Sequence, residues 1–251
     1  MVLIAIGGAE ERIGERSVLK RVLEEAKGDA SHVHVITTAT GYPEEVGETY
    51  QNAFDDLSAS CTISHITSKD EADDPKFLEQ IKQADVVFFS GGDQRRLAKA
   101  FNDTECLEIL KARDIVIAGT SAGAAIMSEL MVVGGHPDDA HIKGEIKSDR
   151  GFGLADDIVF DTHFLQRDRL PRLFNLVAGA PEKIGIGLDE DTGVILKGDG
   201  TVEAFGSNAV TIVDGSSLTS CDYDAVDDGQ EFEATGFQVT TLKHGNTYKL
   251  R

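Results

Sequence analysis

The chain has 251 residues, of which 41% are hydrophobic and 27% charged, a composition typical of an ordinary soluble globular protein and unlike that of a disordered or fibrous one. Its formal net charge of −20 disfavours binding to nucleic acid and to anionic membrane surfaces, and its longest apolar runs are too short to span a bilayer. The acidity has two interpretations: solubility, for instance in a salty cytoplasm, or steering of a cationic substrate.

The first two-thirds of the chain alternates short β-branched apolar runs with amphipathic stretches, the pattern of a parallel sheet covered by helices. The expected strands are Val2–Ile6, His32–Thr37, Thr62–Ile66, Asp85–Phe89 and Asp114–Ala118. Helices are expected at about Ser17–Ala26, after Pro43, and after Asp74, where an N-cap aspartate precedes a proline.

Beyond residue 184 the pattern changes to short strands. They are expected at Ile184–Leu188, Gly193–Leu196, Thr201–Phe205 and Ala209–Val213. The acidic stretch from Asp222 to Glu233 is expected to be a solvated loop, and Gln238–Leu242 is expected to form a closing hairpin with Thr247–Leu250. No repeat or linker interrupts the chain, so we expect one α/β domain over residues 1–251, with a mixed sheet in its C-terminal part.

The cysteines and the N-terminus favour a cytoplasmic location. Cys61, Cys106 and Cys221 are odd in number, scattered and without CxxC spacing, so neither a disulfide framework nor a structural zinc site is expected. The chain enters a strand-like run at Met1, with no basic segment before a long apolar stretch, so we expect no secretory signal.

The most informative segment is the GxSxG pattern Gly119-Thr120-Ser121-Ala122-Gly123, between a buried strand and an alanine-rich stretch expected to be a helix. A nucleophile elbow needs this context, because its sharp turn leaves no room for flanking side chains and lifts the serine oxygen out of the sheet edge. The N-terminus of the following helix would face a developing oxyanion. The alternative is a glycine-lined turn in which Ser121 only caps the helix.

A nucleophilic serine needs a base and a group that orients the base. Among the seven histidines we favour His163, which follows a strand-like apolar run, and the acidic turn after residue 188 offers Asp189 or Glu190 as the orienting group. The order Ser121, His163, Glu190 is not that of the α/β-hydrolases, in which the acid precedes the histidine. An esterase of that fold would need His244 as the base.

Five segments together resemble the cyanophycinase family of serine peptidases, whose smaller relatives are aspartyl dipeptidases. They are Ile6-Gly7-Gly8-Ala9-Glu10, Phe89-Ser90-Gly91-Gly92-Asp93-Gln94, Gly119-Thr120-Ser121-Ala122-Gly123-Ala124, Asp161-Thr162-His163-Phe164 with the arginines that follow it, and Gly185-Ile186-Gly187-Leu188-Asp189-Glu190. The resemblance covers nearly the whole chain. It implies a flavodoxin-like α/β fold, related to the class I glutamine amidotransferases: a three-layer sandwich with a largely parallel sheet, extra C-terminal strands, and the active site at the strand carboxyl ends.

Carried over by motif, the resemblance implies that Ser121 is the nucleophile, His163 the general base and Glu190 the orienting acid. It also implies an oxyanion hole built from the backbone amides of Ala122 and of the Gly92-Asp93 turn. The residues that match the family's substrate pocket are Gln94, Asp161, Thr162, Arg167, Arg169 and Arg172.

Members of this family cut cyanophycin, a polyaspartate backbone that carries arginine on its β-carboxyls, into β-aspartyl-arginine dipeptides. The expected partner is therefore a peptide with aspartyl and arginyl groups. The reaction needs no metal and no organic cofactor, and a homodimer is expected because dimers are common in the family.

The arginines suit such a substrate, because guanidinium groups bind carboxylates through two parallel hydrogen bonds. Two or three of Arg95, Arg96, Arg167, Arg169 and Arg172 are expected to contact substrate, the others pairing with surface acids. An acidic residue such as Asp161 is expected to meet the substrate guanidinium.

One position departs from the family pattern, which places glutamine between the aspartate and histidine where this chain has Thr162. Threonine is shorter and lacks the amide's paired donor and acceptor. Cleavage is expected to survive, whereas the substrate is open: the polymer, or small β-aspartyl or acidic peptides. A relative that binds such peptides without cleaving them is the non-enzymatic alternative.

Overall fold

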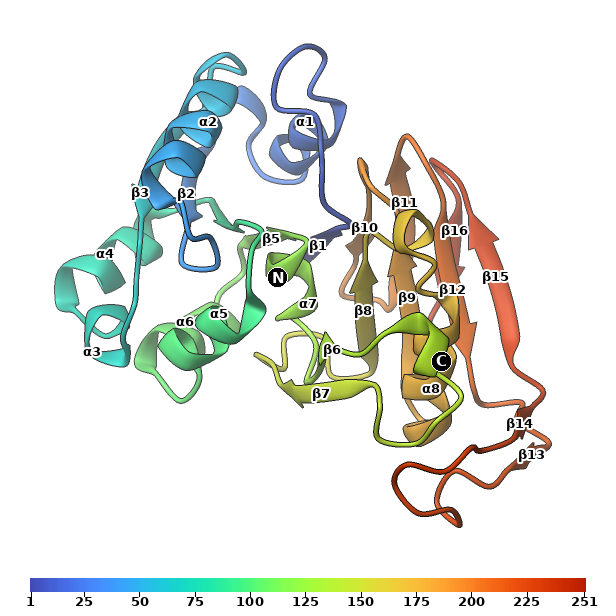
Figure 1. Ribbon diagram of the computed structural model, residues 1–251. Coiled ribbons are helices and arrows are strands. Elements are labelled where there is room, and N and C mark those ends of the chain that lie inside the picture. Colours follow the sequence, from blue (N-terminus) through green and yellow to red (C-terminus); the bar gives the residue numbers. More distant parts are fainter.

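The computed structural model describes residues 1–251 and is organised around an eight-stranded sheet in the order β16-β11-β10-β1-β5-β4-β2-β3 (Figure 1). Its parallel strands are β1 (Val2–Ile6), β2 (His32–Ile36), β3 (Ser60–Ser64), β4 (Val86–Phe89) and β5 (Val116–Thr120). The antiparallel extension consists of β10 (Thr192–Leu196), β11 (Thr201–Gly206) and β16 (Thr247–Lys249).

A second sheet has the order β15-β12-β9-β8. Its strands are β8 (Ile158–Thr162), β9 (Ile184–Leu188), β12 (Val210–Asp214) and β15 (Gln238–Leu242). It packs on the antiparallel end of the large sheet, since Ile186 and Ile212 share one hydrophobic cluster with Val194 and Val202. The C-terminal strands therefore lie at the opposite end of the molecule from α2, β2 and β3 (Figure 1).

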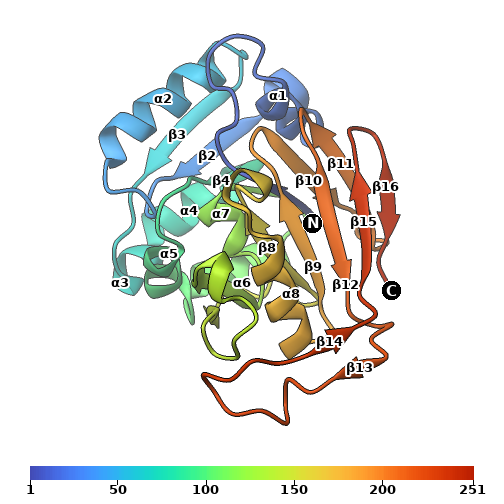
Figure 2. The same cartoon turned by 45° about the vertical axis from the view of Figure 1, so that its right-hand side comes forward.

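Helices cover both faces of the parallel strands, and one helix covers the outside of the second sheet (Figure 2). The first face carries α1 (Ser17–Glu24) and α2 (Pro43–Asp55). The opposite face carries α3 (Lys69–Ala72), α4 (Pro75–Gln83), α5 (Gln94–Phe101), α6 (Glu105–Ala112) and α7 (Ala122–Ala125). The last helix, α8 (Leu170–Gly179), packs on the second sheet. Short 3₁₀ turns occupy Gly28–Ala30, Pro137–Asp139 and Leu165–Arg167.

The layers follow from the alternation of side chains along each strand. In β1, Ile4 and Ile6 join the cluster beneath α1 and α2, whereas Leu3 and Ala5 join the cluster on the opposite face. Asp74 caps α4 as expected, because its carboxylate accepts from two backbone N–H groups of the first turn. The predicted α/β architecture with a largely parallel sheet and extra C-terminal strands is therefore confirmed.

Three local predictions are wrong. β3 spans Ser60–Ser64 and not Thr62–Ile66, because this half-exposed edge strand takes its register from β2 and not from its own apolar residues. The alanine-rich segment after Ser121 forms only the single helical turn of α7. The two last strands do not form a hairpin: β15 pairs with β12 and β16 pairs with β11, so the turn between them carries the chain from one sheet to the other.

The sequence patterns also missed a hairpin, β6 (Leu130–Gly134) with β7 (Lys147–Arg150), which packs beside β8. The acidic stretch is a loop, as predicted, and is flanked by the two-residue strands β13 (Ser220–Cys221) and β14 (Ala234–Thr235). None of the helices has both the length and the apolar character that a bilayer-spanning segment requires.

Candidate active site

Backbone carbonyls at the end of β1 and just after it accept hydrogen bonds from three segments that carry candidate catalytic residues. The carbonyl of Ile6 accepts from the N–H of Ser121 at 2.9 Å, that of Gly7 from His163 at 2.8 Å, and that of Gly8 from Asp191 at 2.9 Å. Ser121 follows β5, His163 follows β8, and Asp191 follows β9 by three residues. The carboxyl ends of strands from both sheets therefore converge on the end of β1, where open α/β sheets bind ligands.

Ser121 occupies a strained turn. Its backbone has φ 51° and ψ −108°, a combination that residues other than glycine rarely adopt. The turn closes because its neighbours lack side chains: a Cβ at Gly119 would lie 2.2 Å from the Gly123 carbonyl oxygen, and one at Gly123 would lie 2.1 Å from that of Phe89. The two glycines of the GxSxG pattern are therefore sterically required, as in a nucleophile elbow.

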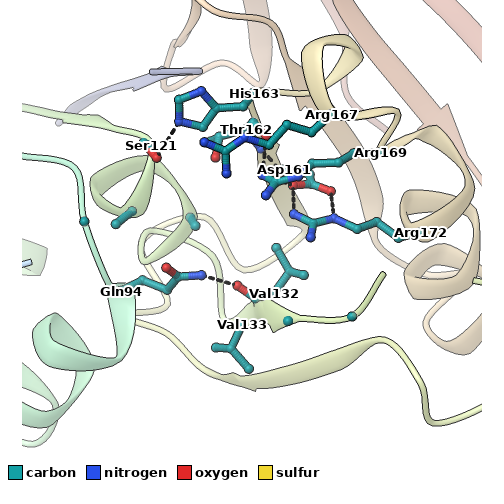
Figure 3. A pocket seen from close by; sticks show the side chains of 15 residues that line it. Gln94, Ser121, Val132, Val133, Asp161, Thr162, His163, Arg167, Arg169 and Arg172 are labelled. Atoms are coloured by element: carbon teal, nitrogen blue, oxygen red, sulfur yellow. Dashed lines mark hydrogen bonds and ion pairs between the residues drawn. The ribbon is translucent and has the colours of Figure 1, made fainter. Parts of the chain in front are cut away.

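The imidazole of His163 lies between a hydroxyl and a carboxylate. The Oγ of Ser121 is 3.0 Å from its Nε2 (Figure 3). Oε1 of Glu190 is 2.7 Å from its Nδ1. Burial lowers the pKa of His163, and the charge of Arg167 lowers it further, while the hydrogen bond to Glu190 acts in the opposite direction. At neutral pH the ring is therefore uncharged and able to accept a proton.

The two acids that the turn after residue 188 offers have different partners. Both carboxylate oxygens of Asp189 accept backbone N–H groups, from Leu165 at 3.0 Å and Ala209 at 3.2 Å, and its side chain is buried. Glu190, one residue later along the chain, points the other way and reaches His163. Asp189 anchors the backbone, so Glu190 is the group in a position to orient the imidazole.

Among the backbone N–H groups near Ser121 that have no acceptor within the chain are those of Gly92 and Ala122, and both residues line the same cavity as the serine. Asp93 is different from what was expected, because its N–H already donates to the Ala39 carbonyl at 2.9 Å. A Cβ at Gly92 would lie 2.1 Å from that same carbonyl oxygen, so only glycine fits this turn.

An arginine-rich cavity of about 310 Å³ opens beside Ser121 (Figure 3). Its lining includes all six residues expected in the substrate pocket, Gln94, Asp161, Thr162, Arg167, Arg169 and Arg172, together with residues 132–135 of the β6–β7 hairpin. The hairpin could not be foreseen as part of the site, since nothing in its sequence marks it as more than an apolar segment. Gln94 is tied to it by a hydrogen bond from Nε2 to the Val132 carbonyl at 2.6 Å.

Asp161 is fully buried at the bottom of this cavity. Its two oxygens accept from Nε and Nη2 of Arg172, and Arg169 donates to the carbonyl of Thr162 (Figure 3). Burial lowers the pKa of Arg169 to about 10, with a smaller contribution from the charges of Arg172 and Arg167, and the group stays charged at neutral pH. The expectation that Asp161 meets a substrate guanidinium does not fit this arrangement, because its oxygens are committed to Arg172.

The remaining candidates lie outside this cavity. Arg95 forms an exposed ion pair with Asp93, and Arg96 donates to the Thr40 carbonyl, so three of the five arginines considered line the site. His244 is exposed in the turn between β15 and β16 and has no contact with Ser121. No cluster of three or more His, Cys, Asp or Glu side chains has the arrangement of a metal site.

Comparisons with known proteins show the family to which the chain belongs. Residues 1–204 match the family model of Peptidase family S51. The chain is 31% identical over 255 residues to a cyanophycinase of Synechococcus elongatus (100% of this chain, 79% of the relative) and 30% identical over 253 residues to one of Trichormus variabilis (99% and 85%). Its fold matches the crystal structure of a peptidase from an acI-B1 actinobacterium with a TM-score of 0.75 at 21% identity, covering 99% of this chain and 96% of the other.

Proposed function

Because the chain belongs to peptidase family S51 and is a serine-type peptidase, we propose that it hydrolyses aspartyl-linked peptides through a triad of Ser121, His163 and Glu190. The observation that carries the proposal is the continuous contact from Oγ of Ser121 to Nε2 of His163 at 3.0 Å and from Nδ1 to Glu190 at 2.7 Å. This sequence of contacts activates serine in acyl transfer on several unrelated folds.

In the first half-reaction the Ser121 hydroxyl gives its proton to Nε2 of His163 while Oγ bonds to the scissile carbonyl carbon. The oxyanion that forms accepts hydrogen bonds from the free N–H groups of Gly92 and Ala122. When the intermediate collapses, the C–N bond breaks and the imidazolium returns the proton to the leaving amine. Water then attacks the acyl-enzyme by the same route, with His163 as the base, and releases the acid and the free serine.

Glu190 acts by holding the imidazole. Its hydrogen bond to Nδ1–H keeps Nε2 unprotonated in the resting state, and its charge stabilises the imidazolium that forms during the attack. Gly8 supports the same orientation, because it leaves space for the imidazole that any Cβ would occupy.

The arginine-rich cavity supports a substrate that carries free carboxylates. Arg167 forms no ion pair within the chain, and Arg169 and Arg172 add two further guanidinium groups around one carboxylate, so the cavity is cationic within a chain of net charge −20. A β-aspartyl-arginine unit presents such carboxylates. We therefore favour cyanophycin-like substrates cut to β-aspartyl-arginine dipeptides, the substrate class that the names of the relatives at about 30% identity also suggest.

Thr162 supports a second candidate, a small acidic or β-aspartyl dipeptidase. The residue is almost fully buried in the lining of the cavity, where a glutamine amide would offer a donor and an acceptor that threonine lacks. Incubation with cyanophycin and with a panel of β-aspartyl dipeptides, followed by mass spectrometry of the products, separates the two. Release of β-aspartyl-arginine from the polymer supports the first; cleavage of the dipeptides alone supports the second.

Ser121→Ala tests the triad. On any cleaved substrate, turnover should fall by about 10⁶, the scale of removing a triad nucleophile, and a loss of tenfold or less contradicts the assignment. A relative that binds without cleaving is tested by a serine-directed phosphonate: covalent labelling at Ser121 of the native protein supports the enzyme.

The proposal extends to a cytoplasmic homodimer. All three cysteines are free, which suits a reducing compartment. Light scattering of the purified protein gives the oligomeric state directly.

A further inference from the structure

Two arginines have guanidinium groups that donate no hydrogen bond to the rest of the chain. The arginines that pair with a carboxylate are Arg16, Arg21, Arg95, Arg150, Arg169, Arg172 and Arg251. Arg96 and Arg113 donate to backbone carbonyls. The two that remain are Arg12 and Arg167. In a chain with 44 acidic residues, a guanidinium without a carboxylate partner is an exception that needs a reason.

The two arginines line two different cavities that share Ser121, His163 and Gly92. Arg167 belongs to the arginine-rich cavity described above. Arg12 belongs to a second cavity of about 250 Å³, which also contains Glu10, Tyr50 and Thr120. One free guanidinium therefore lies on each side of the nucleophile and base.

Short contacts hold Arg12 in place on the second side. The N–H of Glu11 donates to Asp191, and the carbonyl of Arg12 accepts from Nε of Arg16, so the backbone is tied on both sides of the residue. The guanidinium carbon lies 5.3 Å from the centre of the Tyr50 ring, the spacing of a cation–π contact. This contact positions the group without consuming its N–H donors.

Glu10 cannot be the charge that this cavity offers to a ligand. Its side chain is buried, one oxygen accepts the Tyr50 hydroxyl, and the other accepts the Thr120 hydroxyl. Through these two hydrogen bonds Glu10 connects Tyr50 of α2 to Thr120, the residue before Ser121. The group with free donors is Arg12, so the cavity favours an anion, and a planar carboxylate matches the guanidinium fork.

The position of the imidazole indicates which half of the substrate enters this cavity. Gly8 lines the second cavity and not the first, and its hydrogen facing the ring points at Cε1 and Nε2 of His163, where a Cβ would lie 2.4 Å and 2.5 Å away. Nε2 is the atom that protonates the leaving amine. A leaving half that meets Nε2 from the side of Gly8 would extend into the second cavity.

We propose that the cavity lined by Arg12 and Tyr50 binds the leaving half of the substrate, and that Arg12 binds a carboxylate of that half. The proposal rests on the proposed function for its reaction, but it assigns a residue and a cavity that the arginine-rich pocket does not include. The enzyme then selects an acidic unit on both sides of the scissile bond.

The experiment compares three substrates made of two β-aspartyl-arginine units joined by an aspartyl peptide bond. The first has free carboxylates, the second has the carboxylates of its leaving unit converted to carboxamides, and the third has the arginine of its acyl unit amidated. For the wild type, kcat/KM should fall about tenfold or more from the first substrate to the second, because a charge-assisted hydrogen bond is lost. In Arg12→Gln that difference should disappear.

Two variants provide the controls. Arg12→Lys keeps the charge without the two-pronged geometry and should recover part of the preference. Lys20→Gln, on the exposed face of α1, removes the same charge away from the cavity and should keep the full preference. Arg12→Gln should respond to amidation of the acyl unit as the wild type does. The proposal is overturned if Arg12→Gln keeps the wild-type preference for the first substrate, or if only its response to the third substrate changes.

A binding measurement separates this proposal from the proposed function. The affinity of Ser121→Ala for the first and second substrates is measured by calorimetry, with and without Arg12→Gln. If the wild type cleaves none of the substrates, the proposed function fails. The Arg12 proposal is still supported when the Kd values of the first and second substrates differ by about tenfold and Arg12→Gln abolishes this difference. It is overturned when the two Kd values do not differ, or when they still differ in Arg12→Gln.

Discussion

Gly8 and His163 are in direct steric contact: a Cβ added to Gly8 would lie 2.4 Å from Cε1 and 2.5 Å from Nε2 of the imidazole. Gly8 also has φ +100°, a backbone conformation that L-residues rarely adopt. The position of the candidate base is therefore determined partly by the absence of a side chain on the chain segment that follows β1.

Gly8→Ala should move the imidazole away from Ser121. Because a shift of about 1 Å at a reacting group costs roughly 10²-fold in rate, kcat/KM should fall by about that factor, and the strained backbone should cost about 1–3 kcal/mol of stability. Kinetics and thermal unfolding measure the two effects. Gly28→Ala, where the added Cβ meets nothing within 4 Å and φ is also positive, controls for backbone strain alone. Wild-type kinetics in Gly8→Ala would contradict the assigned contact.

The pH profile should report His163. Burial lowers its pKa from the ordinary value near 6.5, and the free base is the active form. We therefore expect kcat/KM to rise with pH and then to level off, with the midpoint of the rise below pH 6.5. An acidic limb centred at or above pH 7 would argue against His163 as the base.

Glu190→Gln should change this profile in a defined direction. The hydrogen bond and charge of Glu190 raise the pKa of His163, so their loss should move the acidic limb to lower pH. Turnover should also fall by about 10⁴, the scale of replacing the orienting acid of a triad by its amide. Asp189→Asn is the neighbouring control: it weakens backbone anchoring and should lower the melting temperature without shifting the limb. A shift in the Asp189 variant alone would reverse the two assignments.

Breaking the buried pair of Asp161 and Arg172 should cost both stability and substrate affinity. Asp161→Asn leaves the Arg172 cation buried without its carboxylate, a loss of about 3–5 kcal/mol. KM should rise because Arg172 is no longer held. Asp161→Leu combined with Arg172→Met removes both charges and should restore most of the stability, measured by urea unfolding, while KM stays high. Restored KM in the double variant would show that the pair is only structural.

Thr162→Gln should change the preference among substrates and leave the chemistry intact. The glutamine amide adds a donor and an acceptor to the lining of the arginine-rich cavity, so the ratio of kcat/KM for cyanophycin to that for a β-aspartyl dipeptide should rise, by roughly tenfold for one well-placed hydrogen bond. Thr162→Val is the matched control without added polarity. Loss of activity on every substrate would contradict a role confined to selection.

Local patterns were enough to predict four of the five parallel strands, because each of these is a short apolar run bounded by glycine, proline or a helix cap. They also indicated Ser121, His163 and an acid at residue 189 or 190 as candidates at strand ends, and the resemblance to a family implied Glu190. That the strand ends come from two different sheets is visible only in the structure. The resemblance to a family named the six pocket positions that the structure brings around one cavity. The edge strand β3 and the separate partners of β15 and β16 were not predictable, because register and strand partners depend on residues far away in the chain.

The sequence by itself indicated the turn at Ser121, where a Cβ at Gly119 would meet the carbonyl of Gly123 only four residues later. The need for glycine at 123 comes from the tertiary structure, because a Cβ there would meet the Phe89 carbonyl of β4. Only the tertiary structure gave Asp189 and Glu190, which are adjacent in the chain, their different partners, and committed Asp161 to Arg172. Only the tertiary structure, likewise, showed that Arg12 has no carboxylate partner within the chain. An unpaired charge is a property of the surroundings of a residue, and those surroundings form only when the whole chain has folded.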